Sequence, residues 1–507
     1  MSALMEAAPT ATPTQQSRNS WAAVFALARC EARRLLMTIP VLLGFLVYAA
    51  WIVWTAQDYA DGYPALQDAD RATQGGPLLV GLAVLLAVNQ AVLRSLRRDT
   101  ERHFTVLVMS RAHRTAAHLL SVVPAALLTA VCVAGQFGWQ ALKPGVVGHG
   151  SPGELLVGPL TVLAFGAAGV LIARVIRTPF TAPLVVVFFL FLFLLSTGAG
   201  VDEGWTRWLT PVIGVASSNT LPSDLIGRPA AWHALYLAAL GLTVALLAVL
   251  VGGGLRARSV QAGFVGALAL TVLGAVAQGQ GVSPELTAAR ERATLHPEQV
   301  QTCVERDGSR YCAFPEWRGR TADWARTVAE VQSLAGGAAH DQSLLVRQRL
   351  DARYGLDGDA ALDPASTPHQ VTVGTAWGGN RVPEFSAAVA GVLVTGDEKT
   401  AGELCDGRMV TIMWLALAGQ SDPLGSLKNV RLDDSLSGSA IVLSQTNPLT
   451  MTAGQTTVVR ELLERPRDEV AAKVKTNWTE LTSPKVTTAQ VAQLLGVRAK
   501  VGADKCS

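Results

Sequence analysis

The sequence FTAPLVVVFFLFLFLLSTGAG, residues 180–200, contains no charged side chain. A helix needs about twenty such residues to cross the roughly 30 Å hydrocarbon core of a bilayer. Six further apolar segments lie before residue 281, and no comparable segment follows residue 282. We therefore predict seven transmembrane helices, over residues 37–56, 77–93, 117–141, 155–173, 180–200, 232–254 and 260–280.

The composition agrees with a membrane protein, since 50% of the residues are hydrophobic and only 16% are charged. The net charge of +3 is too small to indicate nucleic-acid binding. Asn89, Gln90 and Gln136 are the main polar residues inside the predicted spans, where such side chains usually form hydrogen bonds between helices. No Asp, Glu or Lys within a span indicates an ion relay, which argues against an ion-coupled transporter.

Orientation follows from the basic residues that flank the spans. Thirteen Arg residues lie on the side of the N-terminus, and only four basic residues occur in the opposite loops, Arg71, Lys143, Arg207 and Arg228. Basic residues concentrate on the cytoplasmic side of membrane proteins, so we expect a cytoplasmic N-terminus in the cell membrane. Residues 1–19 are expected to form a disordered cytoplasmic tail. An odd number of spans then places residues 282–507 outside the cytoplasm.

The cysteines fit this topology. Four of the six lie in residues 282–507, and an even number in an oxidising compartment favours disulfides. Cys303 and Cys312 flank a hairpin-turn signal, Asp307-Gly308, so we expect them to pair and leave Cys405 to pair with Cys506. Three pairings are formally open. A zinc site is the competing interpretation, but the chain has no C-x-x-C motif or nearby His pair to support it.

The longest predicted cytoplasmic loop is RSLRRDTERHFTVLVMSRAHRT, residues 94–115. It has an apolar centre between two basic segments, as expected of a helix that docks into a partner's groove. The alternative is that its arginines only set topology and lie at lipid phosphates. No metal-binding or catalytic motif occurs here.

This loop is similar to the segment after the second span in the permease subunits of ABC-2 type transporters. In that family a coupling helix at this position contacts a separate ATPase. The chain keeps the arginine frame and the apolar turn, with Phe104, Val106 and Ser110 where the family usually has Gly, Glu and Pro. The resemblance implies an ATPase-coupling surface formed by Glu101, Arg102, Phe104, Leu107, Val108, Arg111 and Arg114.

The resemblance extends over residues 20–255. Residues 20–36 have the apolar spacing of an interfacial helix, although a helical extension of the first span is the alternative. We therefore divide the chain into this interfacial helix, a six-span permease core over residues 37–255, a seventh transmembrane helix at 256–281, and an extracytoplasmic domain at 282–507. The family also implies a second permease copy or a homologue as a partner.

Residues 282–507 are expected to form a mainly helical α+β domain. Helical patterns cover 315–335, 455–481 with a break near Pro466, and 486–497, and extended segments are expected at 370–376 and 439–444. The glycines of residues 391–396 are followed by Asp397 and Glu398, which would repel phosphate, so this segment is not a nucleotide-binding loop. No catalytic motif stands out, and no cofactor or metal is expected on this chain.

Together these features predict the membrane subunit of an ATP-driven ABC transporter, used for export, with ATP bound by a separate polypeptide. The alternative is a membrane receptor whose extracytoplasmic domain binds a ligand and signals through a cytoplasmic partner. A membrane-anchored enzyme is the third possibility, but it would leave most of the spans without a role.

Overall fold

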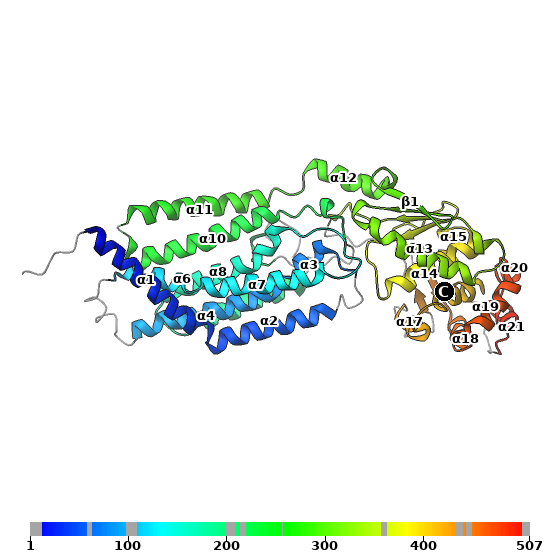
Figure 1. The fold of residues 1–507 in the computed structure, drawn as a ribbon, viewed down its shortest axis with the longest axis horizontal. Helices are drawn as coiled ribbons and strands as arrows, with labels where there is room; N and C mark the ends of the chain where they lie inside the picture. Colours follow the sequence, from blue (N-terminus) through cyan, green and yellow to red (C-terminus); the bar gives the residue numbers. More distant parts are fainter. Residues whose placement is uncertain are drawn as a thin grey trace, which may run out of the picture.

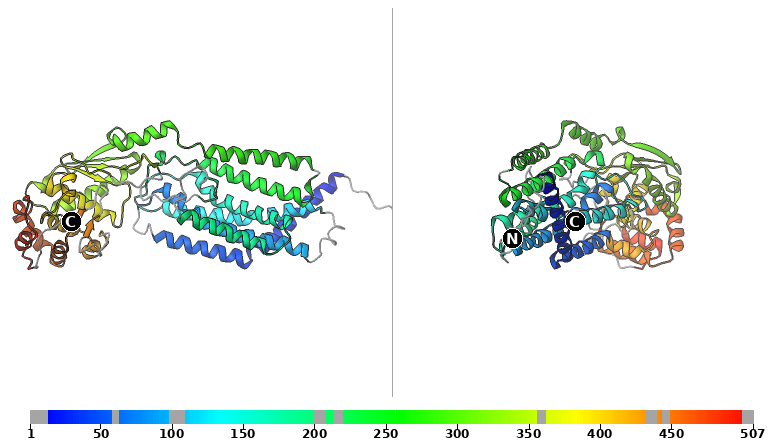
Figure 2. Two further views of the ribbon diagram at one scale, coloured as in Figure 1. Left: turned by 180° about the vertical axis from the view of Figure 1, so that it is seen from behind. Right: turned by 60° about the vertical axis from the view of Figure 1, so that its left-hand side comes forward.

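A computed structural model describes residues 13–57, 63–97, 109–198, 208–212, 220–255, 257–355, 362–430, 440–442 and 449–498. The molecule is elongated, with a bundle of long helices at one end and an α+β domain at the other (Figure 1). We call residues 282–498 the C-terminal domain. The N-terminal helix crosses the end of the bundle that is farthest from this domain (Figures 1 and 2). We call that end the α1 end.

The bundle helices overlap the predicted spans, except for the short helix at residues 66–72, which lies in the loop expected between the first two spans. They are α2 (Ile39–Gln57), α3 (Leu66–Ala72), α4 (Gly75–Arg97), α6 (Arg111–Leu120), α7 (Val123–Ala141), α8 (Pro152–Val175), α9 (Thr181–Gly198), α10 (Ala230–Val249) with its π-helical extension η3 (Leu250–Gly254), and α11 (Arg258–Gln278). Five helical stretches are long and apolar enough to cross a membrane, or six if the bent pair α1–α2 counts as one. The protein is therefore membrane-embedded, while the number of seven spans stays a prediction.

Helix α1 (Pro13–Leu36) is separate from α2. The two axes are bent by 59° at residues 37–38. Pro40 contributes to the break, because proline has no N–H to continue the helical hydrogen bonds. The bend favours a distinct N-terminal helix over a straight extension of the first span. Helix α1 also begins earlier than expected, at Pro13, within residues that the sequence analysis assigned to a disordered tail; proline is well suited to a first helical turn.

Helix α8 lies at the centre of the bundle, where it packs against α4, α7 and α10. Its glycines permit this close packing: a Cβ on Gly169 would lie 2.5 Å from the backbone oxygen of Leu85 in α4. Asn89 of α4 donates a 3.1 Å hydrogen bond to the Gly169 carbonyl. Tyr48 of α2 donates one of 3.2 Å to Gln136 of α7. Both contacts confirm the expected interhelical role of these polar side chains.

The C-terminal domain begins with α12 (Pro284–Leu295) and continues into a four-stranded sheet. The strands are β1 (Thr302–Arg306), β2 (Ser309–Ala313), β3 (Leu345–Gln348) and β4 (Gln370–Val373), in that order, with β1–β2 antiparallel and the other two pairs parallel. The turn at Asp307-Gly308 has positive φ at both residues, as a tight hairpin requires. It sets Cys303 opposite Cys312, and the predicted disulfide between them is present.

Helices pack around this sheet to form the core. Trp317, Trp324 and Trp414 are fully buried there, and they come from three different helices. The long helices are α13 (Thr321–Leu334), α14 (Arg381–Thr395), α16 (Arg408–Leu417), α18 (Ala453–Leu463), α19 (Arg467–Thr476) and α21 (Thr488–Leu495). The helices expected at 315–335, 455–481 and 486–497 are confirmed, including the break near Pro466. Helices α14 and α16 were not predicted from the sequence.

Short elements complete the domain and its connections. They are η2 (Ser223–Leu225), η4 (Pro297–Gln299), η5 (Pro315–Arg320), η6 (Gly337–Asp341), α15 (Glu398–Gly402), α17 (Pro423–Asn429), α20 (Trp478–Leu481) and the hairpin β5 (Ala440–Val442) with β6 (Leu449–Met451). The extended segments expected at 370–376 and 439–444 contain β4 and β5. The mainly helical α+β character of this domain is thus confirmed.

Candidate functional site

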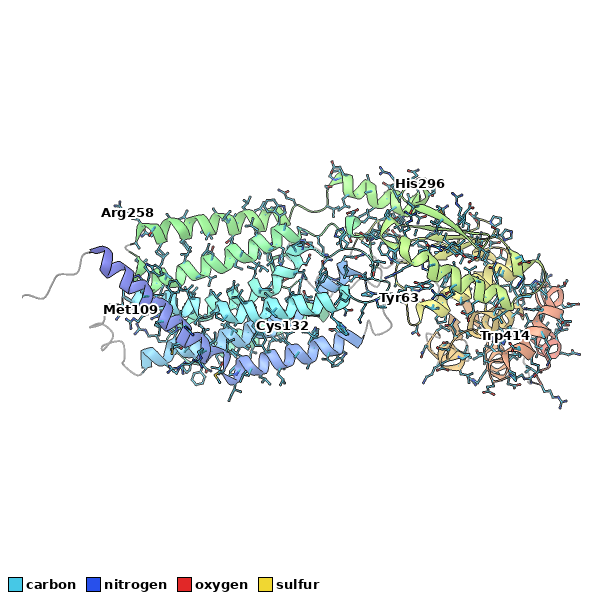
Figure 3. The ribbon with its side chains drawn as sticks, viewed as in Figure 1. Tyr63, Met109, Cys132, Arg258, His296 and Trp414 are labelled. Carbon is cyan, nitrogen blue, oxygen red and sulfur yellow. A yellow bond between two sulfur atoms is a disulfide. The ribbon has the colours of Figure 1, made fainter. Side chains whose placement is uncertain are left out.

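At the α1 end of the bundle, α1 packs against α6. Val24 and Ala28 of α1 are buried together with Ala117 of α6. The rings of Trp21 and His113 meet edge to face, with their centroids 5.4 Å apart. Helix α1 and helix α6, which begins after the apolar centre of the 94–115 segment, therefore form one packed unit. Figure 3 marks Met109, which precedes α6, at this end.

The start of α6 is well defined. Ser110 caps the helix, since its side-chain oxygen accepts a 3.2 Å hydrogen bond from the His113 backbone N–H. This cap satisfies a backbone N–H of the first turn of α6 and so defines where the helix begins.

The predicted ATPase-coupling residues divide into two groups. Two of them lie in α6: the side chain of Arg111 is exposed, whereas Arg114 is only 7% exposed. Arg111 therefore has surface available for a partner, and burial leaves Arg114 very little. The remaining five lie outside the described residues: Glu101, Arg102, Phe104, Leu107 and Val108.

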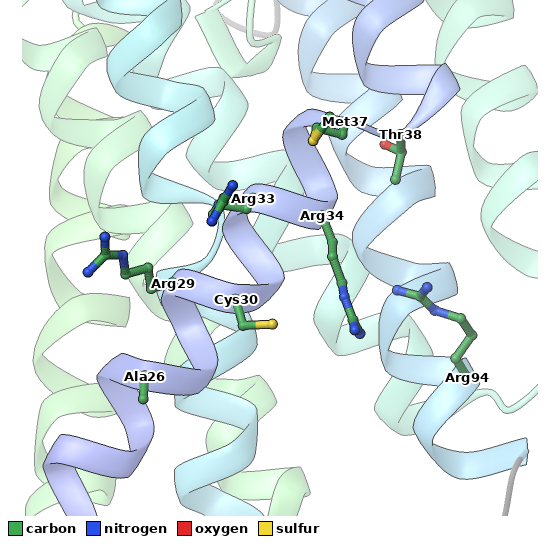
Figure 4. Close-up of a pocket in the computed structure, with 8 residues that line it drawn as sticks. All are labelled: Ala26, Arg29, Cys30, Arg33, Arg34, Met37, Thr38 and Arg94. Carbon is green, nitrogen blue, oxygen red and sulfur yellow. The ribbon is translucent and has the colours of Figure 1, made fainter.

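A basic cavity of about 740 Å³ also opens at the α1 end, between α1 and the last turns of α4 (Figure 4). Its charged lining residues are all arginines: Arg29, Arg33, Arg34 and Arg94. From the sequence, all four arginines were interpreted as topology signals, and Arg29, Arg33 and Arg34 also as charged residues of the interfacial helix. Their gathering around one cavity depends on α1 folding back across α4.

The opposite end of the bundle is held together by buried charge. We call this end, formed by residues 63–75, 143–154 and 220–229, the docking end. The side chain of Arg228 is 5% exposed; its guanidinium nitrogens lie 3.5 Å from an Asp70 oxygen and 3.4 Å from a Glu154 oxygen. Arg228 also donates a 2.6 Å hydrogen bond to the Gln67 carbonyl. Because a buried charge is costly without partners, these contacts tie three separate segments together.

The C-terminal domain sits on the docking end through Arg320, which is 2% exposed. Its guanidinium donates hydrogen bonds to the carbonyls of Tyr63 (2.7 Å) and Gly145 (3.3 Å), both in the docking end, and to Thr375 (2.9 Å) within its own domain. Burial lowers the pKa of Arg320 to about 10, so the group stays charged at neutral pH. These hydrogen bonds are therefore charge-assisted, and the two shorter ones, to Tyr63 and Thr375, are the stronger.

Two further contacts hold the segment that leads into α10. The carboxylate of Glu316 accepts a 3.2 Å hydrogen bond from the Ser223 backbone N–H. Arg290 of α12 donates to the carbonyls of Leu225 (2.8 Å) and Ile226 (2.6 Å). Residues 220–229 therefore contact the bundle through Arg228 and the C-terminal domain through Glu316 and Arg290.

Cysteine and metal chemistry add little to the site. Cys405 is disulfide-bonded, and Cys506, its expected partner, lies outside the described residues. Within the parts of the chain that the structure describes, no group of three or more His, Cys, Asp or Glu side chains could hold a metal ion.

The docking contacts were not predicted from the sequence. Arg228 carried a signal, as one of only four basic residues in the predicted outer loops. Arg320 and Arg290 carried none, because each lies among other charged residues of ordinary surface character.

Comparison of the chain with protein families, with curated proteins and with solved structures gives no match. The function is therefore inferred from the geometry described above and from the sequence.

Proposed function

We propose that the chain is the membrane-spanning permease subunit of an ATP-driven ABC transporter of the ABC-2 type, working as an exporter. A separate ATPase binds the 94–115 segment from the cytoplasm. A second permease copy or a homologue completes the transport path. The C-terminal domain lies outside the cytoplasm, and the chain itself binds no cofactor.

The observation that carries this proposal is the packing of α1 against α6. A partner that pushes on the segment before Ser110 displaces α6 directly. Because Val24 and Ala28 pack on Ala117, the same push moves α1. A force applied at one short segment is thus passed to two elements at the α1 end, which is what coupling to an external motor requires.

The distribution of charge supports the orientation. Arg258 begins α11 at the α1 end (Figure 3), the end that also carries the arginines of the basic cavity. The Cys303–Cys312 disulfide lies in the domain at the other end. A basic end and a disulfide-bearing end agree with a cytoplasmic N-terminus and an extracytoplasmic C-terminal domain.

The test is co-purification of the ATPase from the native membrane in mild detergent. Substituting Phe104, Leu107 and Val108 by Asp removes the apolar anchors of the coupling segment, and we expect the ATPase to be lost while membrane insertion is retained. The matched control is Leu142→Asp. Leu142 is an exposed apolar side chain directly after α7, next to the docking end. An ATPase that still co-purifies with the triple variant contradicts the proposal. A receptor would instead co-purify with a signalling partner that is not a transporter ATPase.

A further inference from the structure

The basic cavity at the α1 end has a lining that the proposed function does not explain. It is formed by two helices and the bend between α1 and α2, and its lining residues are Ala26, Arg29, Cys30, Arg33, Arg34, Met37, Thr38 and Arg94. In Figure 4 the side chains of Cys30, Arg34 and Arg94 point toward the space between α1 and α4. The cavity therefore combines cationic groups from separate elements around one volume.

Among the described residues, the charge in this cavity is only partly compensated. Glu31 is its one acidic neighbour among the described residues, and it lies 3.7 Å from a nitrogen of Arg34 and 3.7 Å from a nitrogen of Arg94. Those separations exceed the roughly 2.7–2.9 Å of a charge-assisted hydrogen bond, so both guanidinium groups keep donors available. Their side chains are 63% and 52% exposed. Arg29 and Arg33 form no ion pair with any described residue.

An exposed apolar stripe starts directly beside the cavity. Met37, at the bend, is 75% exposed, and Ile39, the first residue of α2, is 80% exposed. Leu42, Leu43 and Leu46 follow on α2 and are also exposed. The spacing of three and four residues places these side chains along one face of the helix. A cationic cavity is thus continuous with an apolar face that leads along the bundle.

We propose that this cavity binds the phosphate head group of an anionic phospholipid, whose acyl chain lies along the stripe on α2. Among the described residues, four arginines against one glutamate leave a net charge of about +3 to meet the phosphodiester anion. Basic pockets between membrane helices recognise anionic head groups in this way. Free phosphate has the same head-group chemistry but leaves the apolar stripe uncovered, so a lipid is the occupant that satisfies both surfaces. The site does not depend on the identity of any ATPase.

Cys30 provides a reporter inside the cavity, because its thiol is exposed and free. The assay uses the full chain with Cys132 replaced by Ser, reconstituted into vesicles of pure phosphatidylcholine or of phosphatidylcholine mixed with phosphatidylglycerol. The rate of Cys30 labelling by an uncharged maleimide is measured in both. A further sample contains phosphatidylcholine vesicles and millimolar inorganic phosphate.

We expect phosphatidylglycerol to slow the labelling of Cys30 by at least about fivefold, the contribution of roughly one basic side chain to binding an anionic membrane. The double variant R34Q/R94Q should label equally fast in both kinds of vesicle. The matched control, R177Q/R258Q, removes two exposed arginines outside the cavity and should keep the protection. Equal rates in the two kinds of vesicle for the parent protein overturn the proposal. Equal loss of protection in both double variants also overturns the proposal, because it indicates a general surface potential. Protection of Cys30 by inorganic phosphate alone overturns it as well, because it indicates a free anion.

Discussion

Replacing Arg320 by Met should release the C-terminal domain from the docking end. The substitution keeps the length of the side chain and removes the charge. Two hydrogen bonds across the boundary are lost, to the carbonyls of Tyr63 at 2.7 Å and Gly145 at 3.3 Å. Bonds that involve a charged group contribute about 1.5–3 kcal/mol each, and the longer one belongs at or below the low end of that range.

The expected loss is therefore about 3 kcal/mol of docking free energy. That value corresponds to a change of about a hundredfold in the equilibrium between docked and released states. Arg320 also bonds to Thr375 in its own domain at 2.9 Å, so the domain itself loses some stability. The assay must separate these two effects.

Hydrogen–deuterium exchange makes that separation. The amides of Leu66 and Val147 are hydrogen-bonded within the docking end, at 2.9 and 3.1 Å. In R320M, peptides that contain them should exchange up to about a hundredfold faster, while amides of α14 and α16 in the domain core keep their protection. The control is Arg318→Met, two residues away on η5, where the side chain is exposed. Unchanged exchange at the docking end would refute the reasoning, and simultaneous loss of protection in α14 and α16 would show unfolding instead of release.

Two further predictions concern the domain core and the bundle. Burial raises the pKa of Glu384 above its usual 4.5, despite the Arg381 guanidinium 2.8 Å away, so folding favours the protonated acid. The stabilisation that comes from protonated Glu384 is complete below pH 4.5 and is lost as the pH rises through the raised pKa. The melting temperature of Glu384→Gln should therefore decline less over this pH interval than that of the parent. Parallel curves of melting temperature against pH for the two proteins would contradict this. In the bundle, Gly169→Ala forces a methyl group against the Leu85 backbone and should destabilise the protein by about 1–3 kcal/mol in thermal unfolding in detergent. The matched change Gly135→Ala, which meets open space, should instead stabilise α7 by about 0.5–1 kcal/mol, and equal effects of the two changes would rule out the packing argument.

The positions of the elements could be predicted well where the signal was local. The apolar segments located the bundle helices, and the turn at Asp307-Gly308 located the hairpin and its disulfide. The helices α14 and α16 were missed because they are buried on nearly all sides. Such helices show no polar face, and without that contrast their periodicity does not stand out from the sequence.

The candidate sites were harder to predict than the elements. The coupling segment was predicted from its basic and apolar pattern and from its resemblance to ABC-2 permeases, and most of its predicted residues lie outside the described structure. Arg34 and Arg94 looked like topology signals, since each follows or precedes an apolar segment. Only the 59° bend after α1 brings α1 over α4 and gathers these side chains around one cavity.

The sequence by itself determined that the chain is embedded in a membrane through apolar helices that lie before residue 281, and that an α+β domain follows. The length of an apolar segment, the residues of a turn and the spacing of cysteines are local properties. They have the same effect whatever tertiary structure surrounds them. The tertiary structure alone decided how the domain is held. Arg320 bonds to Tyr63, 257 positions away in the chain, and Arg228 bonds to Gln67 across 161 positions. Such contacts form because a buried guanidinium must find acceptors among whatever backbone surrounds it, and no local pattern in the sequence records which backbone that is.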